Sequence, residues 1–219
     1  MSGVLRRQLV VALGAAPLVS ALPGCVGLGE APAHVYYELD DTAAPARPAR
    51  AGGGRAAAGA ARARTLLVAG SAASAFYDST GLAYSRSAGA RAYYQLASWT
   101  ERPAGRIARL LERRLAASGA FADVASATAA VRGDWLLELQ LEQLYHDDAT
   151  PPGVARIELT AELTDWVARR TIGRRRFAQA EPLASESAAQ AVAAFERALA
   201  RLLDDAHGWV LAQADRPAA

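Results

Sequence analysis

The sequence contains no lysine, and all 24 of its basic residues are arginines. The 22 acidic residues nearly balance them, which leaves a formal net charge of +2. A charge this close to neutral is not typical of a nucleic-acid-binding protein, whose surface carries a clear excess of basic residues. We therefore expect no nucleic-acid partner. Cysteine is almost as rare, because Cys25 is the only one, so the chain cannot form an internal disulfide.

The sequence also lacks the motifs that mark common catalytic sites. Gly52-Gly53-Gly54 is not followed by the Lys-Ser or Lys-Thr of a phosphate-binding loop, and no G-x-S-x-G segment is present. The histidines lie far apart, and His146-Asp147-Asp148 alone supplies too few ligands for a zinc site, which needs about three or four. We expect a hairpin loop with solvated charges there. We also expect no enzyme activity, no cofactor and no metal.

No apolar run is long enough to cross a membrane. The run from Leu9 to Leu22 is shorter than the about 20 residues that a spanning helix needs. It follows Arg6 and Arg7, and a charged start before an apolar segment is typical of a secretory signal peptide.

The apolar run ends at Leu22-Pro23-Gly24-Cys25, which predicts a bacterial lipoprotein signal. In such a signal a diacylglycerol alkylates the thiol, the peptide before it is removed, and the new amine is acylated. Pro23 departs from the small or β-branched residue usual at its position. We predict a signal peptide at 1–24, lipidation of Cys25 and a tether at 25–33. Val26, in place of an aspartate that favours the inner membrane, favours the outer membrane. The alternative is a buried free cysteine, but no periodic apolar residues surround Cys25.

Two long segments, 134–144 and 154–165, alternate apolar and polar residues as half-buried strands do. Pro151-Pro152-Gly153 between them predicts an antiparallel hairpin. Shorter strands are predicted at 34–39, 65–69 (closed by Gly70), 82–86, 90–96, 121–124 and 171–180. Arg174-Arg175-Arg176 on the last of them predicts a solvated sheet edge. The composition of residues 42–64, rich in Ala, Arg, Gly and Pro, predicts a flexible, disordered insert.

Two segments have the spacing of amphipathic helices. The first follows Trp99, with Thr100 as a candidate N-cap, Pro103 in the first turn and Gly119 as a C-cap. The second begins near Ser185. Their apolar stripes are Ile107, Leu110, Leu111 and Leu115, and Val192, Phe195, Leu199, Leu202, Leu203, Ala206 and Trp209. The sequence therefore predicts an α+β domain over 34–212, with a largely antiparallel sheet and two amphipathic helices packed on one face.

Several short segments behind the predicted lipid site resemble the ABC-type transport auxiliary lipoproteins, the outer-membrane partners of MCE-type (mammalian cell entry) lipid transport systems. Each segment alone is weakly specific, but their order is more so, and the resemblance covers nearly the whole chain after Cys25. The segments are Tyr36-Tyr37-Glu38-Leu39, Leu82-Ala83-Tyr84-Ser85-Arg86, Tyr93-Tyr94-Gln95-Leu96-Ala97-Ser98-Trp99, Leu115-Ala116-Ala117-Ser118-Gly119-Ala120-Phe121 and Leu137-Glu138-Leu139, followed by the terminal helix.

The resemblance implies a non-catalytic, lipid-anchored auxiliary component of a system that moves lipids or other hydrophobic molecules between the inner and outer membranes. The implied partners are a periplasmic MCE-domain protein with its ABC permease and ATPase, and the outer membrane through the lipid anchor. The resemblance leaves open whether the protein forms a homo-oligomer. The alternative function is an outer-membrane assembly or scaffold lipoprotein that is not tied to transport, while a lipoprotein enzyme is disfavoured by the missing catalytic set.

Aromatic residues are dense between Phe76 and Trp99, where they form either core or a contact surface. We expect Tyr84, Arg86, Tyr93 and Trp99 to lie at or beside the surface that engages the MCE partner. The alternative is that Trp99 and one of the tyrosines pack the sheet against the first helix.

Overall fold

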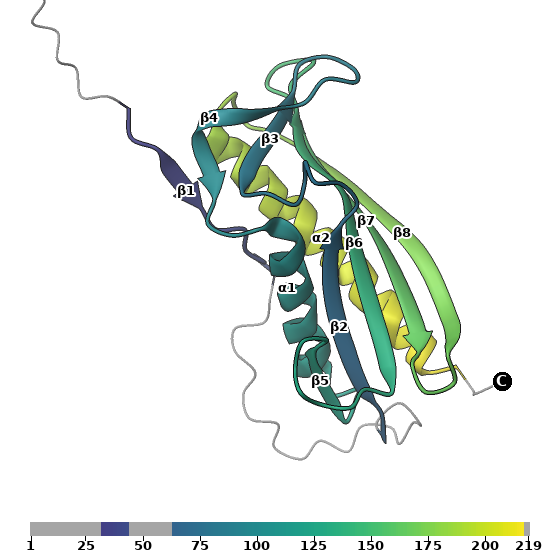
Figure 1. Cartoon of the computed structure of the whole chain (residues 1–219). Coiled ribbons are helices and arrows are strands. Elements are labelled where there is room, and N and C mark those ends of the chain that lie inside the picture. The colour runs from purple at the N-terminus through teal and green to yellow at the C-terminus, as the bar shows by residue number, and fades with distance from the viewer. Residues whose placement is uncertain (1–31, 44–62, 217–219) are drawn as a thin grey trace, which may run out of the picture. The chain divides into compact units, whose positions relative to one another are not determined.

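The computed structural model describes residues 32–43 and 63–216 (Figure 1). All of the described helices and strands lie within residues 33–219, which form one compact unit of the chain. The predicted signal peptide, Cys25 and most of the tether and of the Ala/Arg/Gly-rich insert lie outside the described residues.

The described residues form eight strands and two helices in the order β1–β4, α1, β5–β8, α2. The strands are β1 (Val35–Tyr37), β2 (Thr65–Ala72), β3 (Gly81–Ser85), β4 (Ala92–Trp99), β5 (Asp123–Ser126), β6 (Trp135–Asp147), β7 (Val154–Asp165) and β8 (Arg170–Pro182). The helices are α1 (Pro103–Ser118) and α2 (Ala188–Ala214).

All eight described strands belong to one mixed sheet, in which β6 is the central strand. On one side of β6, the antiparallel ladder β6–β7–β8 forms the longest pairings, as the hairpin prediction requires. On the other side, β2 joins the first half of β6 and β3 joins its end, both in parallel. β4 is antiparallel to β3, and β1 and β5 are short parallel partners of β4 and β2. The α+β class is confirmed, and the sheet combines long antiparallel with shorter parallel pairings.

The predicted alternation in β6 and β7 is confirmed. The inward residues are all buried, namely Trp135, Leu137, Leu139 and Leu141 in β6 and Ala155, Ile157, Leu159, Ala161 and Leu163 in β7. A bulge between Leu141 and Gln143 adds one residue to β6, so the inward set continues at Leu144 rather than at Gln143. The two strands thus present one continuous apolar face.

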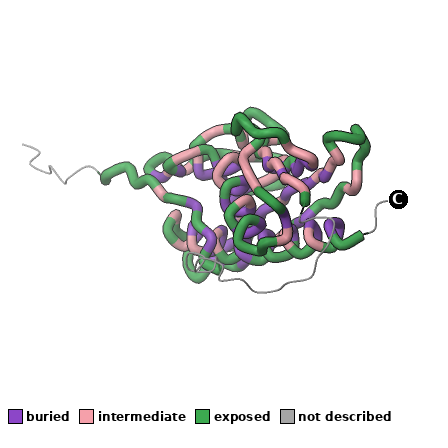
Figure 2. The backbone as a smooth tube through the Cα atoms, turned by 90° about the horizontal axis from the view of Figure 1, so that it is seen from below, coloured by how far each residue is buried: buried purple, intermediate pink, exposed green. Residues whose placement is uncertain are grey.

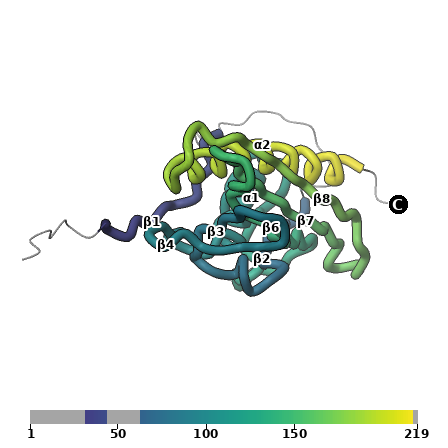
Figure 3. The backbone as a smooth tube through the Cα atoms, turned by 90° about the horizontal axis from the view of Figure 1, so that it is seen from above, coloured from purple at the N-terminus to yellow at the C-terminus, as the bar shows by residue number. Residues whose placement is uncertain are grey.

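Both helices cover the same face of the sheet (Figure 3). The predicted stripe of α2 is buried along its whole length, and the Phe195 ring meets the Trp99 ring edge-on, with centroids 5.7 Å apart. Figure 2 places the buried stretches of both helices and of the strands in the interior, while loops are mostly exposed. Burying each large apolar side chain contributes about 1.5–3 kcal/mol, so this layer dominates the stability of the fold.

The helix termini depart partly from the sequence pattern. Helix α1 begins at Pro103, but its N-cap is Arg102 rather than Thr100, and no side chain caps it. The predicted C-cap is confirmed, because Gly119 has a φ of 64°, a left-handed conformation that favours glycine. Helix α2 begins after Ser187, whose hydroxyl accepts a hydrogen bond from the Gln190 N–H.

The limits of β2 and β5 differ from the predicted ones for packing reasons. β2 continues past Gly70 to Ala72. A Cβ at position 70 would lie 2.6 Å from the Ala104 carbonyl oxygen and 2.8 Å from the Ala108 Cβ. Gly70 therefore lets α1 approach the strand closely and does not end it. β5 begins at Asp123 rather than at Phe121, whose buried ring instead meets the Trp135 ring edge-on.

A buried ion pair ties three segments together beneath the helices. Arg114 of α1 is 8% exposed and makes a two-pronged contact through Nε and Nη2 with the carboxylate of Asp41, which is 6% exposed. The same guanidinium contacts Asp204 of α2. The segment after β1, helix α1 and helix α2 thus share one cation. Removing one partner of such a pair leaves an uncompensated buried charge, which is far more costly than losing an exposed pair.

Arg114→Leu should lower the free energy of unfolding by about 3–5 kcal/mol, because Asp41 would stay buried without its cation. Urea unfolding of the full chain measures this loss. The double variant Arg114→Leu/Asp41→Leu should recover a large part of it, since no buried charge then remains. Arg113→Leu is the matched control, because the Arg113 side chain is 63% exposed and should tolerate the change. Equal stability of Arg114→Leu and Arg113→Leu would contradict this account.

His207 of α2 adds a pH dependence to the same region. Burial, and next the charge of Arg114, lower the pKa of its imidazole below 6.5, while Asp204 acts in the opposite direction. Below pH 6.5 the unfolded chain therefore binds a proton at this residue more readily than the folded chain. Its contribution to stability is present above pH 6.5 and is lost as the pH falls through the lowered pKa.

His207→Gln should therefore reduce the loss of stability on acidification. The urea midpoints of the full chain and of this variant, compared at about pH 5 and about pH 8, should differ less for the variant. The comparison with the parent chain removes the contributions of all other titrating groups, Glu112 and Glu196 included. An identical pH dependence in both proteins would show that His207 is not the responsible group.

Candidate functional site

The four residues predicted as a partner surface lie on or next to the β3–β4 hairpin, but they do not form one patch. Tyr84 pairs with Ala92 across the hairpin, and Tyr93 pairs with Ala83. Because side chains alternate between the faces of a strand, Tyr84 and Tyr93 project from opposite faces. Arg86 follows the last residue of β3, and Trp99 is the last residue of β4.

Trp99 is a core residue. Its side chain is 2% exposed and packs on Phe195 of α2. At 2% exposure Trp99 is not a contact residue of a partner surface, and the alternative prediction, that it packs the sheet against the first helix, is right about its burial but not about the helix, since the ring that it meets is Phe195 of α2. The physical reason is its position at the end of β4, where the strand passes beneath α2.

Tyr93 is 37% exposed but takes part in local packing. Its ring stacks on the Phe76 ring with centroids 4.4 Å apart, and its hydroxyl donates to the Phe76 carbonyl oxygen at 2.6 Å. The ring also covers Gly81, where a Cβ would lie 2.3 Å from the Tyr93 Cδ1. Tyr93 therefore holds the 73–80 loop against β3 and β4, with one edge left exposed.

Tyr84 and Arg86 do lie together, and they form the exposed part of the candidate site. The Arg86 guanidinium lies over the Tyr84 ring, 5.0 Å from its centroid. Its Nε donates to the Asp148 Oδ2 at 3.3 Å. The Arg86 side chain is 69% exposed, while that of Asp148 is 5% exposed. An aromatic ring beneath a cation, held by a buried carboxylate, is a rigid and amphipathic contact surface.

A buried histidine supports this surface from below. The His146 side chain is 1% exposed, and its Nε2 lies 3.0 Å from the carbonyl oxygen of Pro152. A carbonyl oxygen can only accept, so Nε2 donates, and in the neutral imidazole Nδ1 accepts from the Tyr94 hydroxyl at 2.7 Å. The Tyr94 ring in turn contacts the Tyr84 ring, with centroids 5.1 Å apart. The sequence prediction of a solvated loop at His146 is thus wrong, because His146 belongs to β6 and is buried.

Electrostatics at the site keep Tyr94 a hydrogen-bond donor. Burial, and next the charges of Asp148 and Glu186, raise the pKa of Tyr94 to about 12. The phenol therefore stays protonated at physiological pH and continues to donate to His146. The Asp148 hydrogen bond to Arg86 raises the pKa of the guanidinium further above its ordinary value. The site carries one permanent positive charge, on Arg86, beside the carboxylate of Asp148.

Gly153 explains why the preceding hairpin loop closes so tightly on His146. It has a φ of 85°, and a Cβ there would lie 2.3 Å from the His146 Nε2. Only glycine combines this conformation with the contact. The sequence marked Pro151-Pro152-Gly153 as a loop, but nothing in the sequence pattern connects it to a buried imidazole. His146, Tyr94 and Asp148 are therefore residues that sequence reasoning missed.

The face of the sheet that the helices do not cover is polar and carries a hollow. A cavity of about 450 Å³ is lined by Glu142, Gln143, Glu158, Thr160, Arg174, Arg175 and Arg176. Two of its three arginines have carboxylate partners on β7, since Arg174 lies near Glu162 and Arg176 contacts Glu158, while Arg175 lies over the Phe177 ring, 5.1 Å from its centroid. The predicted charged edge at β8 is therefore present, with Arg174 and Arg176 paired across to β7.

The described residues include no group of three or more His, Cys, Asp or Glu side chains that could hold a metal ion. At the Tyr84–Arg86 surface, Arg86 pairs with the Asp148 Oδ2, while the buried Asp148 Oδ1 has no hydrogen-bond partner in the described part of the chain. Neither described helix has the length and apolar content needed to cross a bilayer.

Comparison with known proteins places the chain in a family. A crystal structure of a Xanthomonas campestris protein from the DUF330 family is 26% identical, covers 82% of this chain and 96% of its own length, and superposes with a TM-score of 0.68. A second crystal structure, of an uncharacterised protein, is 13% identical with a TM-score of 0.61 and covers 82% of this chain and 99% of its own, which supports the fold alone. No curated protein sequence matches the chain.

The family model for the ABC-type transport auxiliary lipoprotein component matches residues 39–206. This range begins two residues after β1 and ends within α2, so it includes the whole sheet except β1, together with α1 and most of α2. The chain therefore belongs to the family of ABC-type transport auxiliary lipoprotein components.

Proposed function

We propose that this protein is the lipid-anchored, non-catalytic auxiliary component of an MCE-type transport system that moves lipids or other hydrophobic molecules between the inner and outer membranes. The observation that carries the proposal is the family match over residues 39–206, which associates the chain with ABC-type transport. The MCE assignment rests on the order of the short segments that begins at Tyr36-Tyr37-Glu38-Leu39. The partners are then a periplasmic MCE-domain protein and its ABC permease and ATPase.

Anchoring is the first element of the proposal. Cys25 stands at the end of a lipoprotein-type signal, and acyl chains on this residue would hold the protein at the periplasmic face of the outer membrane. Two or more acyl chains give stable anchoring, whereas one alone binds weakly and reversibly. Val26 after the cysteine supports the outer rather than the inner membrane.

The partner surface is the second element, and its members are now Tyr84 and Arg86. Their side chains are exposed or half-buried, while the residues beneath them, Tyr94, His146 and Asp148, are held by hydrogen bonds. A surface already fixed in place loses little conformational entropy on binding, and tyrosine and arginine are favoured at such contacts. An acidic or aromatic patch on the partner would complement the Arg86 cation and the Tyr84 ring.

Cys25→Ser should leave an unprocessed precursor that incorporates no labelled palmitate, because serine has no thiol for the diacylglycerol to alkylate. Metabolic labelling and the mass of the purified chain measure this directly. Pro23→Ala, which restores the residue type usual before the cleavage site, is the matched control and should be processed at least as well as the natural sequence. Normal palmitate incorporation by Cys25→Ser would overturn the anchoring proposal.

Affinity purification of the tagged full chain in mild detergent should recover an MCE-domain protein together with a permease and an ATPase. Arg86→Lys should weaken this recovery by about tenfold, because lysine keeps the charge beside Asp148 but loses the planar contact over Tyr84. Tyr84→Ala should have a similar effect. Arg174→Lys, at a 62% exposed arginine on β8, is the matched control.

Melting curves of the same variants separate contact from packing. Weakened recovery with an unchanged melting curve supports the partner surface. Recovery equal to the parent protein, or a loss that follows the melting temperature, would retire Tyr84 and Arg86 as contacts. If the parent protein recovers other outer-membrane proteins but no MCE-domain protein, the scaffold alternative replaces the transport role.

A further inference from the structure

Exposed apolar side chains gather at the turn between β7 and β8. Trp166 is 57% exposed and Val167 is 73% exposed, the largest exposed fraction among the large apolar residues of the described chain. Val131, 46% exposed, lies in the loop before β6. The other three described tryptophans are buried, so Trp166 is exceptional in remaining exposed to water. Isolated exposed apolar residues are common, but two consecutive exposed apolar side chains at one turn, one of them a tryptophan, indicate a contact.

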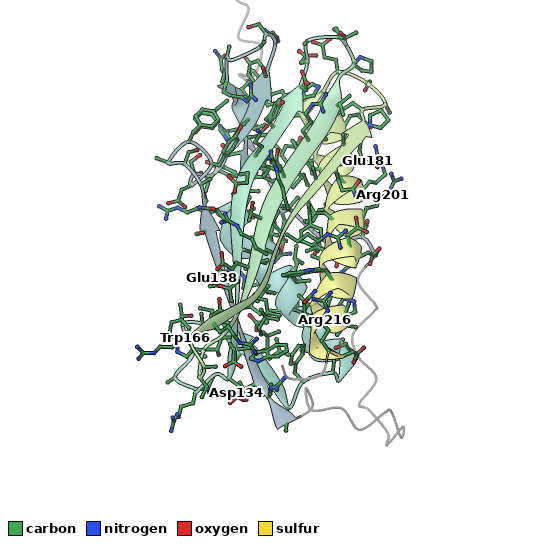
Figure 4. The ribbon with its side chains drawn as sticks, turned by 90° about the vertical axis from the view of Figure 1, so that its right-hand side faces the viewer. Asp134, Glu138, Trp166, Glu181, Arg201 and Arg216 are labelled. Carbon is green, nitrogen blue, oxygen red and sulfur yellow. The ribbon has the colours of Figure 1, made fainter. Side chains whose placement is uncertain are left out.

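The turn holds these side chains in a fixed position. The Ala168 N–H donates to the Asp165 Oδ1 at 2.8 Å, and Arg169 takes a φ of 54°, which closes the turn. The Trp166 N–H donates to the Asp134 carbonyl oxygen at 2.8 Å, which joins the turn to the loop before β6. Figure 4 shows Trp166 and Asp134 at one end of the sheet, away from Glu181. The exposed tryptophan is therefore presented by an ordered turn.

The charged residues around this turn include three arginines without a carboxylate partner among the described residues. Arg132, Arg169 and Arg170 are exposed, and none of them forms an ion pair within the part of the chain that the structure describes. Asp165 and Asp134 each accept a hydrogen bond from a backbone amide, of Ala168 and Thr65, which fixes these carboxylates in place but leaves their negative charges. The turn therefore presents an indole and an aliphatic side chain with unpaired arginines beside them.

We propose that the β7–β8 turn, with Trp166, Val167, Arg169 and Arg170, is a membrane-contact site that inserts into the headgroup region of a bilayer rich in anionic phospholipid. Tryptophan is favoured at the membrane interface, because its ring is largely apolar while its N–H stays near water. Arginines beside it are attracted to anionic headgroups. The match of an apolar tip with an adjacent positive charge favours a bilayer surface as the occupant. The proposal goes beyond the transport role and does not rest on lipidation of Cys25.

The position of the turn keeps this site apart from the Tyr84–Arg86 surface. Asp165 pairs with Trp135 at the beginning of β6, whereas Tyr84 pairs with His146 near its end. β6 has 13 residues, and at about 3.3 Å per residue the two surfaces lie roughly 40 Å apart along the strand. A bilayer at the turn would therefore leave Tyr84 and Arg86 free for a protein partner.

Tryptophan fluorescence of the full chain, reconstituted into vesicles of phosphatidylethanolamine and phosphatidylglycerol with brominated acyl chains, tests the site. Bromine quenches only tryptophans that reach the bilayer, and the four tryptophans of the chain are Trp99, Trp135, Trp166 and Trp209. We expect the loss of fluorescence to approach the share that one of the four tryptophans contributes to the total emission. Trp166→Phe should abolish it without changing the melting temperature, because the side chain is exposed and the other three are buried.

The charge requirement is tested with Arg169→Asn/Arg170→Gln, in which asparagine suits the left-handed conformation at residue 169. Bromine quenching of this variant should be at least about twofold weaker than that of the parent chain. The parent chain should show the same reduction in vesicles of pure brominated phosphatidylcholine, which carry no net charge. The quenching measurement reports on Trp166 alone, and mass spectrometry reports separately on the acylation of Cys25. Failure of the membrane-site proposal therefore does not imply failure of the anchoring proposal, or the reverse. Equal quenching of the parent chain and Trp166→Phe would overturn the membrane site. Loss of co-purified transport proteins in Trp166→Phe, without quenching in the parent, would identify the turn as a protein contact instead.

Discussion

The apolar face of β7 and β8 must be covered, and helix α2 covers it, while α1 covers β2 and part of β6. Ile157, Leu159 and Leu163 of β7 face the stripe of α2, and Phe195 reaches across to Trp99 at the end of β4. Every other element is placed relative to this layer. α1 packs beside α2 over β2, which requires glycine at position 70, and the parallel strands β2 and β3 extend the sheet from the free side of β6. Without the α2 layer the long hairpins would expose a continuous apolar face.

Two buried polar groups give this layered core its specific arrangement. Arg114 joins the segment after β1 to both helices, and its carboxylate partner Asp41 is inaccessible to solvent. His146 joins β6 to β4 and to the Pro152 loop through its two ring nitrogens. Such groups cost desolvation energy, so they stabilise only the arrangement that satisfies all of their hydrogen bonds. They therefore favour one packing of the segments over others that would bury similar apolar area.

The chain belongs to the family of ABC-type transport auxiliary lipoprotein components, and its described part holds no group of three or more His, Cys, Asp or Glu side chains that could bind a metal ion. Two distinctive exposed features of this chain lie at opposite ends of β6. One is the Arg86 cation over Tyr84, supported by a hydrogen-bonded network, and the other is Trp166 at a turn with unpaired arginines. The long β6–β7 pairing keeps the two features at a constant separation, which suits the proposed contacts with a protein at one end and a membrane at the other.

The sequence by itself determined the α+β class, the β6–β7 hairpin, both apolar stripes and the Gly119 cap, because these depend on local periodicity and on backbone preferences of single residues. It also determined the family, through the order of short segments. It misplaced Trp99 on the surface and His146 in a solvated loop, since burial at a strand end depends on which helix passes over it. The pairing of Arg114 with Asp41, the tyrosine–histidine network and the bond from the Trp166 N–H to the Asp134 carbonyl join residues far apart in the chain. Only the tertiary structure decided them, because local sequence pattern carries no information about which distant residue supplies the opposite charge, the hydrogen bond or the covering side chain.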